Sequence, residues 1–114
     1  MLEVNIQQHP GQLYRIDKFK VPPTARAEFL QKVQLTHAVL KTQPGFIQDF
    51  IFEQIGGPGE FNFVTVAVWE SAEAMGVARQ AVITTHQEIG FKPAEMFERL
   101  GIKADVANYT QLEA

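Results

Sequence analysis

Two neighbouring segments of this chain, residues 46–55 and 61–70, have the pattern of β-strands that are apolar on both faces. Alternation places aromatic side chains on one face of each strand and aliphatic ones on the other (Phe46, Phe50 and Phe52 against Ile47, Ile51 and Ile55; Phe61, Phe63 and Trp69 against Val64, Val66 and Val68). The chain has too few helices to cover both faces, and each large apolar side chain left in water forfeits roughly 1.5–3 kcal/mol. The pattern therefore predicts a homodimer that packs sheet against sheet.

Size and composition restrict the class of protein. The 114 residues suit one domain, residues 1–114 with a leader over 1–11, and no repeat or linker divides them. A net charge of −3 without a basic cluster disfavours nucleic acid and anionic lipid as partners. No apolar run is long enough to span a bilayer and no signal peptide is recognisable, so we expect a cytoplasmic protein. The absence of cysteine excludes disulfides, thiol nucleophiles and thiolate metal sites.

Turn and capping signals give the order of the elements. A first strand over 13–21, interrupted on one face by Arg15 and Asp17, precedes a helix over 24–42 that Thr24 can cap. A glycine-rich loop over 56–59 joins the two apolar strands as an antiparallel hairpin. Ser71 can cap a helix over 72–88 that Gly90 ends, and a short helix over 93–100 and a strand over 104–112 follow.

The order βαββαβ predicts an α+β fold of the ferredoxin-like kind, with an antiparallel sheet and its helices on one face. A one-residue error in register exchanges the two faces of a strand. Alternation therefore leaves open which residue set faces the helices and which faces the partner chain.

Short motifs at the junctions resemble the antibiotic biosynthesis monooxygenase family. Pro44-Gly45-Phe46 leads into the second strand, and Val68-Trp69-Glu70-Ser71 followed by Glu73-Ala74 leaves the third. The resemblance extends over about residues 12–112 and implies a dimeric α/β barrel. That family includes cofactor-independent oxygenases that act on anthrones and quinols, haem-degrading enzymes, and members without an assigned reaction.

The resemblance also bears on cofactors. In haem-degrading members a histidine of the second helix ligates iron, helped by an Asn on the first strand and a Trp on the second helix. His86 lies close to the ligand position, but Ala78 stands near the Trp position and Ile16 or Asp17 replaces the Asn. We therefore expect no cofactor, with haem and flavin both disfavoured.

The second helix carries the candidate catalytic residues. Met75, Val82 and Ile83 share one apolar arc of that helix, and Arg79 and His86 fall inside it, two turns apart. Polar groups on a buried face need either a partner or a wet cavity. A ligand pocket between helix and sheet is one interpretation. The alternative is internal pairing, in which Arg79 bridges to an acid on the sheet (Asp49, Glu53 or Glu70) and His86 donates to a backbone carbonyl.

Four further residues are candidates for substrate binding. Trp69 can stack on a planar ligand or seal the core edge, Met75 shares the arc of Arg79, and His37 lies beside Val33 and Leu40 on the first helix. Tyr14 on the first strand can orient a carbonyl or hydroxyl group, or lie at the dimer seam. No pair of ligands with metal-binding spacing occurs on either helix, so we predict no metal site.

These residues favour an oxygenase that acts on a small aromatic substrate, such as a quinol or an anthrone, without a cofactor. His86 would remove a proton from the substrate, Arg79 would stabilise the developing enolate or phenolate, and Trp69 would hold the ring. Two alternatives remain at this point. One is a binding or sensing dimer of the same fold without catalysis, and the other is an isomerase of the same barrel shape.

Overall fold

The structure is a computed structural model that describes residues 11–113. Its strands are β1 (Leu13–Lys20), β2 (Phe46–Glu53), β3 (Phe63–Trp69) and β4 (Lys103–Tyr109). Its helices are a short 3-10 turn, η1 (Pro23–Ala25), then α1 (Arg26–Leu40), α2 (Ala72–Glu88) and α3 (Pro93–Leu100). This order confirms the predicted sequence of elements, while most of the leader, residues 1–10, lies outside the described residues.

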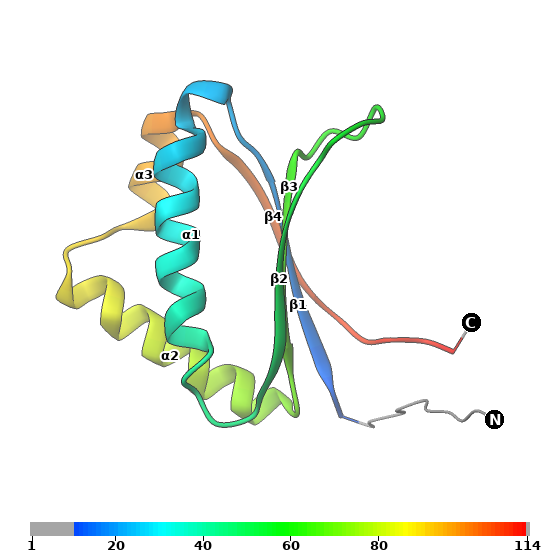
Figure 1. Ribbon diagram of the computed structural model, residues 1–114. Helices are drawn as coiled ribbons and strands as arrows, with labels where there is room; N and C mark the ends of the chain where they lie inside the picture. The colour runs from blue at the N-terminus through cyan, green and yellow to red at the C-terminus, as the bar shows by residue number, and fades with distance from the viewer. Residues whose placement is uncertain (1–10, 114) are drawn as a thin grey trace.

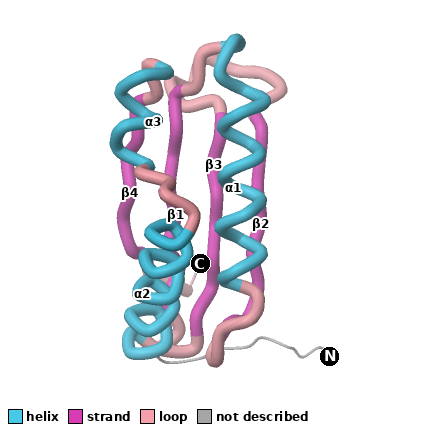
Figure 2. The backbone as a smooth tube through the Cα atoms, turned by 90° about the vertical axis from the view of Figure 1, so that its left-hand side faces the viewer, coloured by secondary structure: helices cyan, strands magenta, loops and turns pink. Residues whose placement is uncertain are grey.

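The four strands form one antiparallel sheet in the order β2-β3-β1-β4. All the helices lie on one side of this sheet, and the other side is open (Figure 1). Viewed from the helical side, α1 crosses in front of β2 and β3, while α2 and α3 lie in front of β1 and β4 (Figure 2). The fold is therefore α+β and ferredoxin-like, as predicted.

The strand register decides which residues face the helices, and it corrects one expectation. Phe46 pairs with Trp69, but a register shift between Phe46 and Gln48 then places Phe50 opposite Val66. The shift reverses the parity of β2. Phe46 therefore shares the helix-facing side with Trp69, at a ring centroid distance of 5.7 Å, whereas Phe50 lies on the open side. Placing Phe46 with Phe50 and Phe52 on one face was wrong, because alternation assumed an uninterrupted strand.

The core consists of two clusters at opposite ends of α1. At its start, Phe29 is fully buried and packs against Phe19 and Phe63, at ring centroid distances of 4.9 and 5.1 Å. At its end, Trp69 packs with Ala67 and Ala78. Helix-facing residues between the clusters include the charged side chains of β1, so the middle of this side is polar.

The helix ends follow the capping signals with one exception. The hydroxyl of Ser71 accepts the backbone N–H of Ala74 at 3.1 Å and caps α2, as predicted. Gly90, at φ +70°, follows the end of α2, and Pro93 opens α3. Thr24 does not cap α1, because it lies inside the 3-10 turn η1 and Ala25 occupies the N-cap position.

The open side of the sheet exposes large apolar side chains. Phe50 and Phe52 are stacked and remain 38 % and 51 % exposed. The β2–β3 hairpin leans toward this open side and carries the fully exposed Ile55 (Figure 1). Within residues 11–113, no helix has the length and apolar character needed to cross a membrane.

Candidate functional site

A cavity of about 690 Å³ lies between the sheet and the three helices. Its walls combine apolar side chains from every helix with a few polar ones, which is the usual composition of a small-molecule site. The apolar part is lined by residues from the three helices, the α2–α3 loop and the sheet (Phe19, Val33, Val82, Phe91, Met96, Phe97 and Val106). The polar part contains His37, His86 and Arg79 from the predicted set.

A second cavity of about 480 Å³ adjoins the first along α2. Trp69 and Met75 line it, together with Leu40 and Ile83. Both cavities share five lining residues (Arg15, Asp17, Thr36, Arg79 and Val82). The two cavities therefore meet at these mostly polar residues. Phe91 lines the larger cavity, and Trp69 lines the smaller one.

His86 is held in the first cavity by polar and aromatic neighbours. Its Nε2 atom lies 3.0 Å from the hydroxyl oxygen of Thr36 on α1, and its ring meets that of Phe91 edge to face at 4.9 Å. The sequence left open a hydrogen bond from His86 to a backbone carbonyl, but in the structure the His86 ring contacts the side chain of Thr36 instead. Burial, and secondarily the positive charge of Lys32, lower the pKa of His86. The neutral imidazole, which can accept a proton, is thereby favoured.

His37 is a buried histidine with an acidic partner. Its Nδ1 atom lies 2.9 Å from an Asp49 carboxylate oxygen, and the residue is only 7 % exposed. An ionised carboxylate only accepts hydrogen bonds, so Asp49 fixes the proton on Nδ1 and leaves Nε2 as the second polar atom of the ring. His37 thus combines a structural bond at one edge with a position in the cavity wall.

Sequence reasoning noticed Arg15 and Asp17 but did not assign them to the site. Both point to the helical side of β1, where Arg15 Nε donates to Asp17 Oδ1 at 2.7 Å. Burial raises the pKa of Asp17, against the opposing effect of Arg15. Their interruption of the apolar face was the signal that could have identified them, since a charged pair in mid-sheet needs a wet cavity or a ligand.

Arg79 makes no ion pair within the described residues. Two of the three acids considered as its partners are engaged elsewhere: Asp49 bonds to His37, and Glu53 accepts two hydrogen bonds from the Arg26 guanidinium group, at 2.7 and 2.8 Å. Glu70 forms no ion pair in the described part of the chain. Arg79 instead lines both cavities. It is exposed at their edge, so the expectation that it lies on a buried face was wrong.

Tyr14 lies apart from the other candidate residues. It pairs with Val68 and Tyr109, on the open side of the sheet, and its hydroxyl donates to Gln111 Oε1 at 2.9 Å. The structure therefore brings together His37, Trp69, Met75, Arg79 and His86 on the helical side and leaves Tyr14 on the opposite face. Tyr14 belongs to the surface where a second copy was expected.

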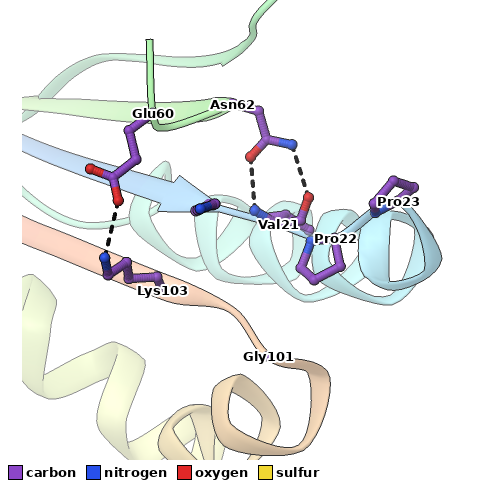
Figure 3. A pocket seen from close by; sticks show the side chains of 8 residues that line it. Val21, Pro22, Pro23, Glu60, Asn62, Gly101 and Lys103 are labelled. Atoms are coloured by element: carbon purple, nitrogen blue, oxygen red, sulfur yellow. Dashed lines mark hydrogen bonds and ion pairs between the residues drawn. The ribbon is translucent and has the colours of Figure 1, made fainter.

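A third cavity, of about 510 Å³, lies at the far end of β1 (Figure 3). There the Asn62 side chain accepts from the backbone N–H of Val21 at 2.8 Å and donates to its carbonyl at 2.9 Å. Glu60 and Lys103 form an exposed ion pair at 3.0 Å beside it. These contacts join the hairpin to β1 and β4, so this hollow has a structural explanation.

Among residues 11–113, no three potential metal ligands gather closely enough to hold an ion.

Comparison with known proteins gives a family. The family model described as antibiotic biosynthesis monooxygenase matches residues 13–91, which include β1 to β3, α1, α2 and the candidate residues of both cavities. No curated protein matches the chain.

Solved structures of similar fold agree with this match. A protein of Shewanella loihica PV-4, provisionally assigned as a monooxygenase, is 19 % identical with a TM-score of 0.68, over 91 % of this chain and 97 % of the other. SnoaB, a cofactor-independent oxygenase of Streptomyces nogalater, is 24 % identical with a TM-score of 0.64, over 91 % and 96 %. The heme-degrading protein Rv3592 of Mycobacterium tuberculosis is 24 % identical with a TM-score of 0.53, over 60 % and 77 %. At such identities the likeness concerns the fold.

Proposed function

This chain belongs to the antibiotic biosynthesis monooxygenase family, and on that basis we propose that it is a cofactor-independent oxygenase acting on a small aromatic substrate such as a quinol or an anthrone. The observation that carries the proposal is the position of His86. A histidine whose pKa is lowered lies in the wall of a cavity of about 690 Å³. Arg79, two turns away on α2 and without a counter-ion among the described residues, lines the same cavity. These two residues supply a base and an anion stabiliser to one cavity.

The first step assigned to this site is proton abstraction. In the tautomer whose Nε2–H donates to Thr36, the Nδ1 atom of His86 carries the lone pair that accepts a proton from the substrate carbon. The substrate becomes an enolate or phenolate, and Arg79 stabilises its negative charge. Val82 and Phe91 keep water from returning the proton.

Dioxygen is the oxidant in this scheme, and the substrate supplies the electrons. For an anthrone, the carbanion reduces dioxygen and forms a carbon–oxygen bond, which gives a hydroperoxide after protonation. Loss of the second proton from that carbon, with cleavage of the O–O bond, leaves a carbonyl group and one molecule of water. The protein provides proton transfer, charge stabilisation and partly apolar walls around the substrate, and the reaction as balanced needs no further reductant.

The residues around His86 fit haem poorly. Its Nε2 atom is bonded to Thr36, so iron ligation at this atom would remove that contact. The buried Ala78 provides no aromatic ring, and Asp17, rather than an amide, extends from β1 into the cavities. This arrangement supports our proposal of a reaction without haem.

The open side of the sheet supports a homodimer as the second part of the proposal. Val66 lies at the centre of an apolar row, between Phe50 on β2 and Ile16 on β1. A second copy of the chain would cover this row and also the stacked pair of Phe50 and Phe52. The proposed arrangement places the ligand on the helical side and the partner on the other.

The cytoplasmic location inferred from the sequence stays a prediction.

Oxygen consumption tests the proposed reaction. With dithranol or menadiol as substrate, the wild-type protein should consume dioxygen faster than the buffer does. His86→Ala should lower kcat by about 10²–10⁴-fold through loss of the base. Arg79→Ala should lower it by about 10²–10³-fold through loss of the anion stabiliser.

A matched control is Lys92→Met, because Lys92 is exposed and lines neither cavity. Its rate should equal that of the wild type. Unchanged rates in both the His86 and the Arg79 variants would eliminate these roles. Conversion of substrate without oxygen uptake would point instead to an isomerase, and ligand binding without any conversion to a sensing module.

A further inference from the structure

The breakdown of the hydroperoxide needs an acid–base group of its own. In the reaction proposed above, the oxygenated carbon still carries one hydrogen beside its hydroperoxide group. Formation of the carbonyl group requires a base for that hydrogen and an acid for the departing hydroxide. One imidazole can perform both tasks in succession, because it takes up a proton near neutral pH and releases it again.

His37 and Asp49 form a histidine–carboxylate pair at the wall of the larger cavity. Nδ1 of the buried His37 lies 2.9 Å from an Asp49 carboxylate oxygen. His37 lines the larger cavity whereas Asp49 lines neither, so the carboxylate lies behind the wall that the ring helps to form. The second ring nitrogen, Nε2, has no hydrogen-bond partner among residues 11–113. A buried imidazole with one nitrogen on a carboxylate and the other free is the arrangement of an oriented general base.

The strand register places this ring between β2 and β1. Asp49 on β2, Ala67 on β3 and Arg15 on β1 form one row on the helical side. With neighbouring strands about 4.8 Å apart, the two ends of this row are separated by about 10 Å. Ala67 carries only a methyl group, which leaves room for the ring of His37 above β3. Burial raises the pKa of Asp17 on β1, while Arg15 and then His37 oppose the rise, so the ring extends toward β1.

The two histidines of the larger cavity have opposite electrostatic surroundings. Both line that cavity, and Thr36, which directly precedes His37 on α1, contacts His86 at 3.0 Å. Burial and the positive charge of Lys32 disfavour the protonated form of His86 and lower its pKa. His37 instead has a carboxylate at 2.9 Å that pairs with its ring when the ring is protonated. Titratable groups with contrasting surroundings take different acid–base roles, so His37 is suited to hold a proton and return it.

We propose that His37, held by Asp49, is the catalytic residue that converts the hydroperoxide into a carbonyl compound and water. Nε2 of His37 takes the remaining proton from the carbon, and the electrons of the C–H bond form the π bond of the carbonyl group as the O–O bond breaks. The departing hydroxide takes the proton from Nε2 and leaves as water, which restores the neutral ring. Carbon is oxidised and the peroxide oxygen is reduced within one molecule, so no co-reactant is needed. The inference rests on the proposed function in taking a hydroperoxide as the intermediate.

The hydroperoxide of fluorene tests this step apart from the reaction with dioxygen. 9-Hydroperoxyfluorene is a flat three-ring compound with one hydrogen on the carbon that bears the hydroperoxide, and its loss of water gives fluorenone. Under nitrogen, the wild-type protein should form fluorenone faster than the buffer does. 9-Hydroperoxy-9-methylfluorene is the matched control probe. It has no hydrogen on that carbon and should give no fluorenone.

Substitutions assign the step to one of the two histidines. His37→Gln should lower kcat for fluorenone formation by about 10²–10⁴-fold, because the amide can keep a hydrogen bond to Asp49 but cannot take up a proton. This loss should exceed that in His86→Ala by at least about tenfold. Glu53→Gln is the matched control, because it removes another carboxylate of β2 that is paired with Arg26 and lines neither cavity. Its rate should equal that of the wild type, and far-ultraviolet circular dichroism confirms that each variant is folded.

Asp49 is a positioning residue in this proposal, and its test includes a spectroscopic signature. Asp49→Asn should lower kcat by at least about tenfold, because an amide can donate to Nδ1 as well as accept from it and no longer fixes the proton there. Nitrogen-15 NMR of histidine-labelled protein should show the neutral ring of His37 protonated at Nδ1 in the wild type and in Glu53→Gln, and at either nitrogen in Asp49→Asn. A loss of rate without a change of tautomer would overturn the role of Asp49.

The outcomes separate this proposal from the proposed oxygenase. Fluorenone formation that persists in His37→Gln, or that falls equally in His86→Ala, would overturn the role of His37, and so would a rate no higher than that of the buffer. Each of these results is compatible with an oxygenase that consumes dioxygen with dithranol at the rates expected above. Formation of fluorenone that depends on His37 would support the proposal even if no substrate consumed dioxygen, and the missing oxygen uptake would then refute the oxygenase alone.

Discussion

At the scale of single residues, the site depends on how its neighbours set the protonation of His86. The ring is partly buried against Phe91, and Lys32 adds a positive charge nearby. Both influences disfavour the imidazolium ion and lower the pKa of His86. A general base must be neutral before it can accept a proton, so this environment keeps the base active at slightly acidic pH.

The first prediction concerns the pH dependence of the reaction. Activity should rise with pH as His86 loses its proton, and the midpoint of kcat/KM should lie below the ordinary histidine value of 6.5. Lys32→Met should move this midpoint upward, because the substitution removes a charge that lowers the pKa of His86. Lys92→Met should leave it unchanged. A midpoint that does not respond to Lys32→Met would refute the assignment of His86 as the base.

The candidate residues could be predicted from the sequence where helical periodicity was enough. Arg79, His86 and Met75 share an arc of α2, and the structure places all three in the cavity walls. Thr36 and Lys32 were missed because the sequence of a helix does not show which of its polar residues face a neighbouring helix. Tyr14 was considered for substrate binding because alternation separates the two faces of a strand but does not show which face is turned toward the helices.

At the scale of secondary structure elements, the turn between α1 and β2 positions the start of α2. Gly45 has φ +82°, and its carbonyl oxygen accepts a hydrogen bond from the backbone N–H of Glu70 at 3.0 Å. A Cβ atom at this glycine would lie 2.5 Å from the Cβ of Ala74 in the first turn of α2. This close approach explains physically why the motif Pro44-Gly45-Phe46 accompanies the motif around Trp69.

The second prediction compares two glycines with similar backbone angles. Gly45→Ala should destabilise the protein by roughly 1–2 kcal/mol for the left-handed conformation and by a further ~1–3 kcal/mol for overpacking against Ala74. Gly90→Ala is the matched control, because Gly90 has φ +70° but nothing within 4 Å of the added carbon. Urea unfolding of both variants measures the difference. Equal losses of stability would show that the contact with Ala74 has no role.

The sequence could not predict the shift in register within β2. The bounds of the strands and helices follow from prolines, glycines and capping residues, which are local signals. A β-bulge leaves no such signal here, because every residue from Phe46 to Phe52 is compatible with an extended strand. Only pairing with β3 shows that Phe46 and Phe50 lie on opposite sides.

At the scale of the whole molecule, the sheet separates two surfaces with different roles in our account. The helical side holds the cavities, with Val33 and Val82 among their walls. The open side carries Val64 and Val66, paired with Phe52 and Phe50. The central claim is that an aromatic ligand binds on the first surface and a second copy of the chain covers the other.

Methyl NMR of valine-labelled protein tests this claim in one series of spectra. Adding anthraquinone-2-carboxylate at constant protein concentration should shift the methyl signals of Val33 and Val82. Diluting the ligand-free protein should instead shift those of Val64 and Val66, as the second copy dissociates. The account would be contradicted if the ligand shifted only the signals of Val64 and Val66. It would also be contradicted if those two signals stayed constant on dilution and sedimentation showed the protein to be a monomer.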